Sequence, residues 1–240
     1  MRRLRGLRGK VIHCVWLGGP KTKLAQECRA SWERFAPDWE IREWGLEKTA
    51  EGWRLKVDGD DAGPVSVPQY VKDALASRKW AFAADWLRFV ALEREGGIYF
   101  DFDVELLRQL DELPDNEWVA GEWICNETAV GMNPCAIALN RGSRVAGQML
   151  SVYDSARFAI DRTVGDLMAG SGVEMSVLPP EVFCPSDHCG RLHVTARTVG
   201  VHHYALSWIT PRRRLARWLN WHGLGWVTEI LLAVWRRLKR

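Results

Sequence analysis

The alternation of apolar and polar positions at the start of the chain predicts strands and a helix in turn. An apolar run at residues 11–17 ends in a Gly-Gly-Pro turn, as a buried strand leading into a glycine loop would. Residues 21–36 repeat apolar side chains at helical spacing, and residues 39–44 alternate as a second strand. A strand, a helix and a strand in this order predict a parallel pair with a right-handed crossover. The pattern therefore favours an α/β fold.

The same pattern predicts further elements along the chain. Residues 70–95 have the apolar spacing of one or two helices, whereas residues 46–68 carry prolines and an acidic, glycine-containing run and are expected to form a flexible loop. Later expectations are a strand at 117–124, a loop and a buried strand over 126–140, a helix at 145–160, a loop with a short helix at 161–176, and a strand and turn over 176–184.

The segment with the most informative chemistry follows the second of these helical stretches. Gly96-Gly97 supplies the backbone freedom that ends a helix, and an apolar strand then runs into Asp101-Phe102-Asp103. In an extended strand residues i and i+2 share a face, so the two carboxylates are expected to point the same way. Burying them unpaired would be costly. A hard divalent cation such as Mg²⁺ or Mn²⁺ would remove that cost and could bridge to substrate phosphates.

Two further charged residues precede this strand on the predicted helix. Asp85 and Arg88 are three positions apart, so they lie on one helical face. They could form a local ion pair, or both could reach into a site beyond the end of the strand.

Composition places the chain among globular proteins. Hydrophobic residues make up 47% and charged residues 26%, which argues against disorder. The 14 tryptophans are unusual. Tryptophan is favoured in cores, in sites that stack sugars or nucleotides, and at membrane interfaces, because its flat apolar face carries one N–H donor.

The formal charge is unevenly distributed. Residues 1–10 carry five basic residues and no acidic ones, and residues 210–240 carry eight basic residues and one acidic one. Since the formal net charge is +3, the long segment between them is acidic, which argues against a nucleic-acid partner. The last stretch is amphipathic and rich in tryptophan, and it predicts a helix that contacts an anionic membrane surface. A helix that docks a partner or packs on the core is the alternative.

Cysteine usage favours a reducing compartment. The six cysteines are scattered and form no Cys-x-x-Cys pair, so we expect reduced thiols, mostly in the core, of a cytoplasmic protein. Neither a secretory signal nor an apolar run of 18 residues is evident in the sequence. With the basic C-terminal stretch, this predicts peripheral association with the inner face of the membrane.

Four sequence motifs resemble those of the DXD-containing glycosyltransferases of family 32. The motifs are IHCVWLGG at 12–19, AFAADWLR at 81–88, GGIYFDFDV at 96–104 and HHYALSW at 202–208. That family includes bacterial capsular-polysaccharide transferases and yeast mannosyltransferases, and it is related to the clostridial glucosylating toxins. The resemblance implies a GT-A nucleotide-diphospho-sugar transferase fold, with a Rossmann-like mixed sheet flanked by helices, over residues 1–210. The basic amphipathic helical extension at 211–240 lies outside the shared motifs.

The resemblance also implies roles for the first two groups of site residues. Val15 and Trp16 would hold and stack the nucleotide base. Asp85 and Arg88 would contact the ribose or donor sugar and the phosphates. Asp101 would meet ribose and sugar hydroxyls, partly through a metal ion.

The remaining roles concern the metal and the diphosphate. Asp103 would be the firmest protein ligand of Mn²⁺ or Mg²⁺, and His203 (or His202) would complete the metal shell. Ser207 and Trp208 would donate hydrogen bonds to the diphosphate.

These roles predict a metal-dependent, retaining glycosyltransferase. Its donor would be a nucleotide-diphosphate sugar, with a UDP-sugar favoured over GDP-mannose. The acceptor would be a glycan or lipid-linked glycan in cell-surface polysaccharide synthesis, such as capsule or lipopolysaccharide.

Two alternatives stay open at this point. A haloacid-dehalogenase-type phosphatase would use Asp101 as nucleophile and Asp103 as acid or base, but its usual lysine has no candidate between Lys79 and Lys239. An inactive sugar-nucleotide-binding or membrane-adaptor protein would bind a donor without turning it over.

Overall fold

The structure is a computed structural model that describes residues 9–124, 129–159, 163–186 and 192–205. The helical extension expected at 211–240 and the predicted site residues Ser207 and Trp208 lie outside the described residues. Within the described ranges, no helix is both long enough and apolar enough to cross a membrane.

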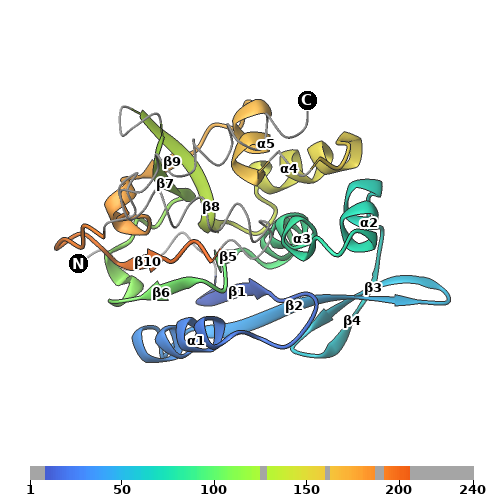
Figure 1. Cartoon of the computed structure of the whole chain (residues 1–240), viewed down its shortest axis with the longest axis horizontal. Helices are drawn as coiled ribbons and strands as arrows, with labels where there is room; N and C mark the ends of the chain where they lie inside the picture. Colours follow the sequence, from blue (N-terminus) through green and yellow to red (C-terminus); the bar gives the residue numbers. More distant parts are fainter. Residues whose placement is uncertain (1–8, 125–128, 160–162, 187–191, 206–240) are drawn as a thin grey trace, which may run out of the picture.

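The fold is built on one eight-stranded sheet with the strand order β4-β3-β2-β1-β5-β8-β7-β9 (Figure 1). Its strands are β1 Val11–Val15, β2 Glu40–Thr49, β3 Gly52–Val57, β4 Asp60–Val65, β5 Gly97–Phe100, β7 Trp118–Ile124, β8 Ala129–Leu139 and β9 Ser176–Leu178. The central pairs β2–β1 and β1–β5 are parallel, as is β7–β9, and the remaining pairs are antiparallel. The sheet is therefore mixed, and the strand, helix and strand expected at the start of the chain are confirmed.

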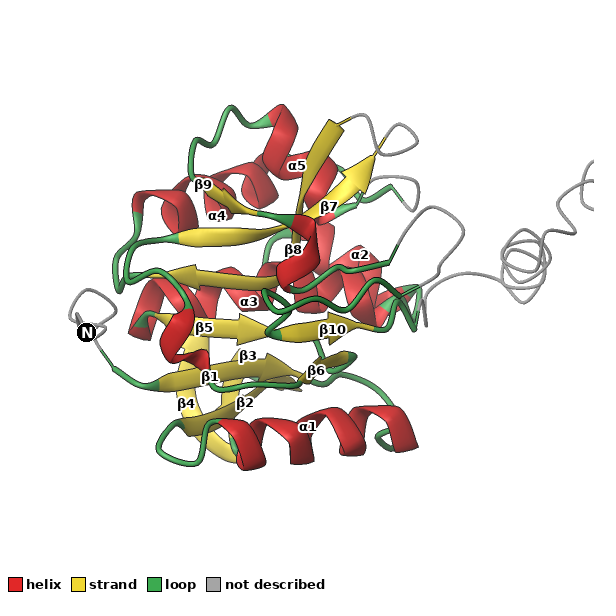
Figure 2. Ribbon diagram, turned by 90° about the vertical axis from the view of Figure 1, so that its left-hand side faces the viewer, coloured by secondary structure: helices red, strands yellow, loops and turns green. Residues whose placement is uncertain are grey.

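Helices cover both faces of this sheet (Figure 2). They are α1 Lys23–Phe35, α2 Gln69–Ala76, α3 Trp80–Glu95, α4 Arg144–Ser155 and α5 Val164–Gly170. Residues of α1 pack in one core cluster, whereas residues of α2, α3, α4 and α5 pack in a second cluster on the opposite face. Side chains of β5 alternate between the two clusters. Ile98 and Phe100 pack on the α1 side of the sheet, and Tyr99 packs on the α3 side.

The prediction of a flexible loop over residues 46–68 is wrong. The segment forms the end of β2 and all of β3 and β4, which pair as two antiparallel hairpins at the edge of the sheet. Asp58 and Gly59 both have positive φ (53° and 91°), as an Asp-Gly hairpin turn requires. Most side chains of these edge strands are exposed or half-buried, but the apolar residues at positions 53, 55 and 57 alternate with basic ones and pack against the core, as in a half-buried strand.

Glycines at the junction of α3 and β5 allow β5 to lie close against β1. Gly96 and Gly97 have φ of 68° and 117°, and Gly96 caps the helix by donating its N–H to the carbonyl of Leu92. A Cβ atom on Gly97 would lie 2.6 Å from the carbonyl oxygen of Val11. The helix stop expected at these glycines is confirmed, and it directs β5 into the centre of the sheet.

The two aspartates lie in a turn rather than at the end of an extended strand. Strand β5 ends at Phe100, and the N–H of Val104 donates to the carbonyl of Asp101 over 3.0 Å. After this turn, β6 Val104–Leu106 pairs antiparallel with β10 Gly200–His202 in a separate two-stranded sheet. Val104 is the register partner of His202, so β10 brings a late segment of the chain beside the aspartate turn.

Candidate functional site

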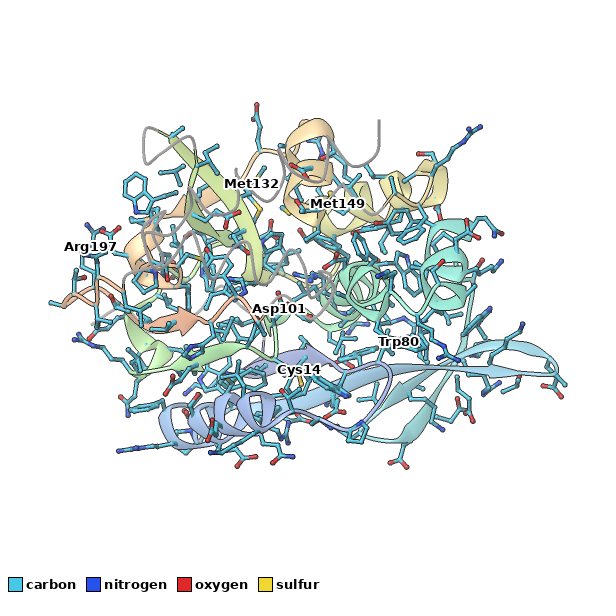
Figure 3. All side chains as sticks on the ribbon, in the orientation of Figure 1. Cys14, Trp80, Asp101, Met132, Met149 and Arg197 are labelled. Atoms are coloured by element: carbon cyan, nitrogen blue, oxygen red, sulfur yellow. The ribbon has the colours of Figure 1, made fainter. Side chains whose placement is uncertain are left out.

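A cavity of about 530 Å³ opens where β1 and β5 end, between α3, β8 and β10. Its lining contains Trp16 of the loop after β1, Asp85 and Arg88 of α3, both aspartates of the turn, Asn133 and Cys135 of β8, and His202 and Tyr204. In Figure 3 the labelled Asp101 lies near the middle of the molecule, between Met132 and Cys14. The cavity therefore gathers most of the expected site residues that the structure describes.

Asp101 is fixed on three sides. Its backbone N–H donates to the carbonyl of Cys135 over 2.8 Å, which ties the turn to β8. Its Oδ1 accepts a hydrogen bond from the hydroxyl of Tyr99 at 2.9 Å and lies 3.2 Å from Nη2 of Arg88. Burial raises the pKa of this carboxyl group, and the nearby guanidinium opposes that rise.

Arg88 lies between the carboxylate of Asp85 on α3 and the carboxylate of Asp101 in the turn. Its side chain is 3% exposed, pairs with Asp85 as well as Asp101, and donates to the carbonyl of Pro134. The guanidinium also lies 4.6 Å from the centre of the Tyr99 ring. Burial raises the pKa of Asp85 to about 7, with Arg88 lowering it and Asp101 raising it. The sequence allowed two roles for Asp85 and Arg88, a local ion pair or side chains that extend into the site. In the structure both hold, because the two residues form an ion pair and both line the cavity.

Asp103 is held as a carboxylate. Burial by itself would raise its pKa, but His202 and the backbone N–H of Ala205 outweigh burial and hold the pKa down at about 2. The Ala205 N–H donates to Oδ2 over 2.7 Å, and Nε2 of His202 lies 3.4 Å from Oδ1. Asp103 is therefore the more firmly ionised member of the pair.

The side chains of Asp101, Asp103 and His202 form a group suited to a metal ion, with one ligand atom of each within 4.8 Å of the others. The arrangement differs from the first expectation for the histidine, which named His203 ahead of its neighbour. Nε2 of His203 instead lies 2.9 Å from Oε2 of Glu105, because successive residues at the end of β10 point to opposite sides. His202 is thus the histidine that faces the aspartates.

Val15 and Trp16 also belong to the cavity lining, where β1 ends. Val15 is buried, whereas Trp16 is half-buried. The indole N–H of Trp16 donates to the carbonyl of Gly19 over 2.7 Å, and its ring meets Phe102 edge-on at 5.2 Å. These contacts hold the Trp16 ring in position in the cavity lining.

A group of polar side chains in the cavity lining was not predicted from the sequence. Oε2 of Glu122 accepts from Nδ2 of Asn133 at 2.8 Å and from the hydroxyl of Tyr204 at 3.1 Å. These residues come from β7, β8 and the segment after β10, and their separations in sequence carry no local signal. Tyr99 was also missed, although it stands two positions before Asp101 and so shares its face.

Comparison with protein-family models matches one segment of the chain. Residues 22–120, less than half of the chain, match the family model described as the glycosyltransferase sugar-binding region containing DXD motif. The matched segment includes α3, β5 and the Asp101–Asp103 turn. No curated protein sequence matches the chain.

The solved structures that match the chain include two glycosyltransferases. One is titled "PaToxG Glycosyltransferase" and aligns over 68% of this chain and 68% of its own, with a TM-score of 0.50 and 18% identity. The other is a glycosyltransferase involved in the glycosylation of the major capsid of PBCV-1, with 89% of this chain and 98% of that chain covered, a TM-score of 0.43 and 9% identity.

The mixed sheet flanked by helices is the GT-A glycosyltransferase fold expected from the sequence. A glycosyltransferase sugar-binding region implies a nucleotide-sugar donor and an acceptor, and enzymes with this region generally use a divalent metal. The matched segment and the site that it carries support a glycosyltransferase of the DXD type, with its sugar-binding region over residues 22–120.

Proposed function

We propose that the protein is a metal-dependent, retaining glycosyltransferase that moves a sugar from a nucleotide-diphosphate sugar to a glycan or lipid-linked glycan. The observation that carries the proposal is the group formed by Asp101, Asp103 and His202 in the wall of a cavity of about 530 Å³. That volume is in the range of sites for small organic ligands. A UDP-sugar is the favoured donor, with GDP-mannose as the alternative.

The donor set fits the cation that such an enzyme needs. Two carboxylates are the hard oxygen ligands that Mg²⁺ and Mn²⁺ prefer, and the His202 ring beside Asp103 helps to keep the second of them ionised. Asp103 is the strongest candidate ligand, because its pKa of about 2 keeps it ionised. Bound there, the cation would stabilise the negative charge that develops on the departing diphosphate.

The protein's own residues hold this site in place. Arg88 keeps a positive charge beside Asp101, and the Tyr99 hydroxyl orients the same carboxylate. Because both partners are buried and both meet Oδ1, this oxygen is held in position before a donor binds. Asp85 and Arg88 also line the cavity, which supports the proposed contact of this pair with donor hydroxyls or phosphates.

Replacement of Trp16 by alanine is expected to weaken nucleotide binding. Stacking of a base on an aromatic ring contributes about 1–3 kcal/mol, so the Kd for UDP in the presence of Mn²⁺ should rise by roughly 5- to 150-fold. Isothermal titration calorimetry measures this change. Trp123→Ala is the matched control, because Trp123 is 43% exposed on β7 and does not line the cavity. Equal affinities for the two variants would remove Trp16 from the base site.

Calorimetric titration of UDP and of GDP, each with and without Mn²⁺, tests the proposal as a whole. We expect binding of one nucleotide that depends on Mn²⁺, together with slow hydrolysis of the matching nucleotide sugar when no acceptor is present. Metal-dependent binding without any turnover would favour an inactive binding protein. Release of inorganic phosphate from a phosphate monoester, without nucleotide binding, would favour the haloacid-dehalogenase-type phosphatase.

We further propose that the acceptor is a lipid-linked glycan at the membrane surface. It is supported by the basic residues gathered at 210–240 and by their tryptophans, which suit an anionic lipid surface. Synthesis of capsule or lipopolysaccharide on the inner face of the membrane would bring such an acceptor to the enzyme.

A further inference from the structure

Two thiols and an imidazole meet directly behind the aspartate turn. Cys135 lies on β8, Cys184 follows a short helical turn at Pro180–Val182, and His202 ends β10. The two sulfur atoms are 3.8 Å apart, and one ligand atom of each of the three residues lies within 4.8 Å of the others. All three side chains are buried, and both cysteines are free thiols.

The spacing of the sulfur atoms fits a tetrahedral metal ion. Two thiolates bound to zinc at about 2.3 Å with a tetrahedral angle lie about 3.8 Å apart. Two thiolates and a neutral imidazole would also balance the charge of a divalent cation, which lowers the cost of burying it. This donor set is soft, unlike the carboxylates of the neighbouring turn, so the two groups favour different ions.

One ring nitrogen of His202 is available to a ligand. Nε2 lies 3.4 Å from Oδ1 of Asp103, and the buried Nδ1 has no hydrogen bond within the described residues, although His202 groups closely with the two thiols. An unsatisfied buried polar atom is costly, and native structures contain few of them. Coordination to a cation would satisfy this nitrogen.

We propose that Cys135, Cys184 and His202 bind a thiophilic divalent cation of the class of Zn²⁺, at a site separate from the cation site of Asp101 and Asp103. The three ligands come from β8, from the segment after the Pro180–Val182 turn and from β10, so the ion ties these segments together. It also fixes the His202 ring whose other nitrogen faces Asp103. The site adds a structural cation to the proposed transferase and does not depend on which nucleotide sugar is the donor.

Titration of the full, reduced chain with Co²⁺ tests this site, because cobalt bound to thiolates gives a charge-transfer band that carboxylate-bound cobalt lacks. We expect the band to saturate at about one equivalent of Co²⁺ and to vanish when Zn²⁺ displaces it. Cys135→Ser and Cys184→Ser should each weaken Co²⁺ binding by more than about 100-fold, since loss of outer partners of a metal ligand already costs roughly 10- to 100-fold.

Two control variants separate this site from the others. Cys14→Ser should keep the band, because Cys14 is buried on β1 away from the group. Asp103→Asn should also keep it, which distinguishes failure of this proposal from failure of the proposed function. Absence of the band in the wild type, or a band that survives both Cys135→Ser and Cys184→Ser, would overturn the proposal.

A measurement on the wild type covers the case in which the serine variants do not fold. X-ray absorption at the zinc edge of the zinc-loaded protein should give two sulfur ligands at about 2.3 Å and the remaining ligands from nitrogen or oxygen. A shell of nitrogen and oxygen alone, or a Cys135–Cys184 disulfide in the reduced preparation, would contradict the site.

Discussion

Asp103→Asn is expected to lower kcat for donor hydrolysis by about 10²- to 10³-fold, the range seen when one group that stabilises developing charge is removed. Asparagine keeps an oxygen for the Ala205 N–H but loses the negative charge that a divalent cation needs. The effect should appear as loss of Mn²⁺-dependent turnover, measured as release of the nucleoside diphosphate at saturating donor.

The matched control for this variant is Asp115→Asn, which changes an exposed aspartate outside the cavity lining. Its turnover should equal that of the wild type. Circular dichroism of both variants checks that the fold is retained. Full activity of Asp103→Asn without added metal would refute the assignment of Asp103 as a metal ligand.

Arg88→Met should have the largest effect on stability. Removal of one partner of a buried ion pair typically costs about 3–5 kcal/mol, because the remaining charges stay buried without compensation. Arg88 is 3% exposed and pairs with two carboxylates, so we expect a loss of that size in the free energy of unfolding, measured by urea denaturation. Arg42→Met should cost about 1 kcal/mol or less, since its ion pairs with Glu40 and Glu95 are partly exposed.

The pH dependence of the Arg88→Met deficit follows from the two carboxylates. Their folded pKa values are already raised by burial, and loss of the guanidinium raises them further. The folded state then binds more protons than the unfolded state, so stability falls as pH rises through the window above the unfolded pKa of about 3.9. The deficit should be smaller at pH 5 than at pH 8. A deficit that is independent of pH would show that lost packing, rather than charge, causes it.

Local patterns predicted those parts of the fold in which one face of an element is buried. The helices at α1 and α3 and the central strands have strong apolar periodicity, and they lie where the sequence placed them. The hairpins formed by the end of β2 with β3 and β4 were missed because the prolines and the acidic, glycine-containing run were interpreted as a loop, although the apolar residues at positions 53, 55 and 57 alternate with basic ones and pack against the core. The Asp58-Gly59 pair was the available signal, and it marks a hairpin turn more specifically than a loop.

The candidate site was predictable only where its residues are close in sequence. Asp85, Arg88 and the two aspartates fall within one helix, turn and strand, so spacing alone grouped them. The choice between His202 and His203 depended on which face of β10 meets the turn, and this is set by pairing with β6. The meeting of Cys135 with Cys184 depends on tertiary packing across 49 positions and leaves no trace in local sequence.

The pairing of β6 with β10 has a consequence for how the site is held together. His202 and the Ala205 N–H reach Asp103 from β10 and the segment after it, and β10 pairs with β6 over three residue pairs outside the eight-stranded sheet. Short ladders open locally at a much lower free energy than global unfolding. Separation of this ladder would remove both partners of Asp103 while the main sheet stayed folded. The free energy that keeps the cation site formed is therefore the free energy of this local opening, which is lower than that of global unfolding. A ligand that contacts both the aspartate turn and β10 would stabilise the paired state.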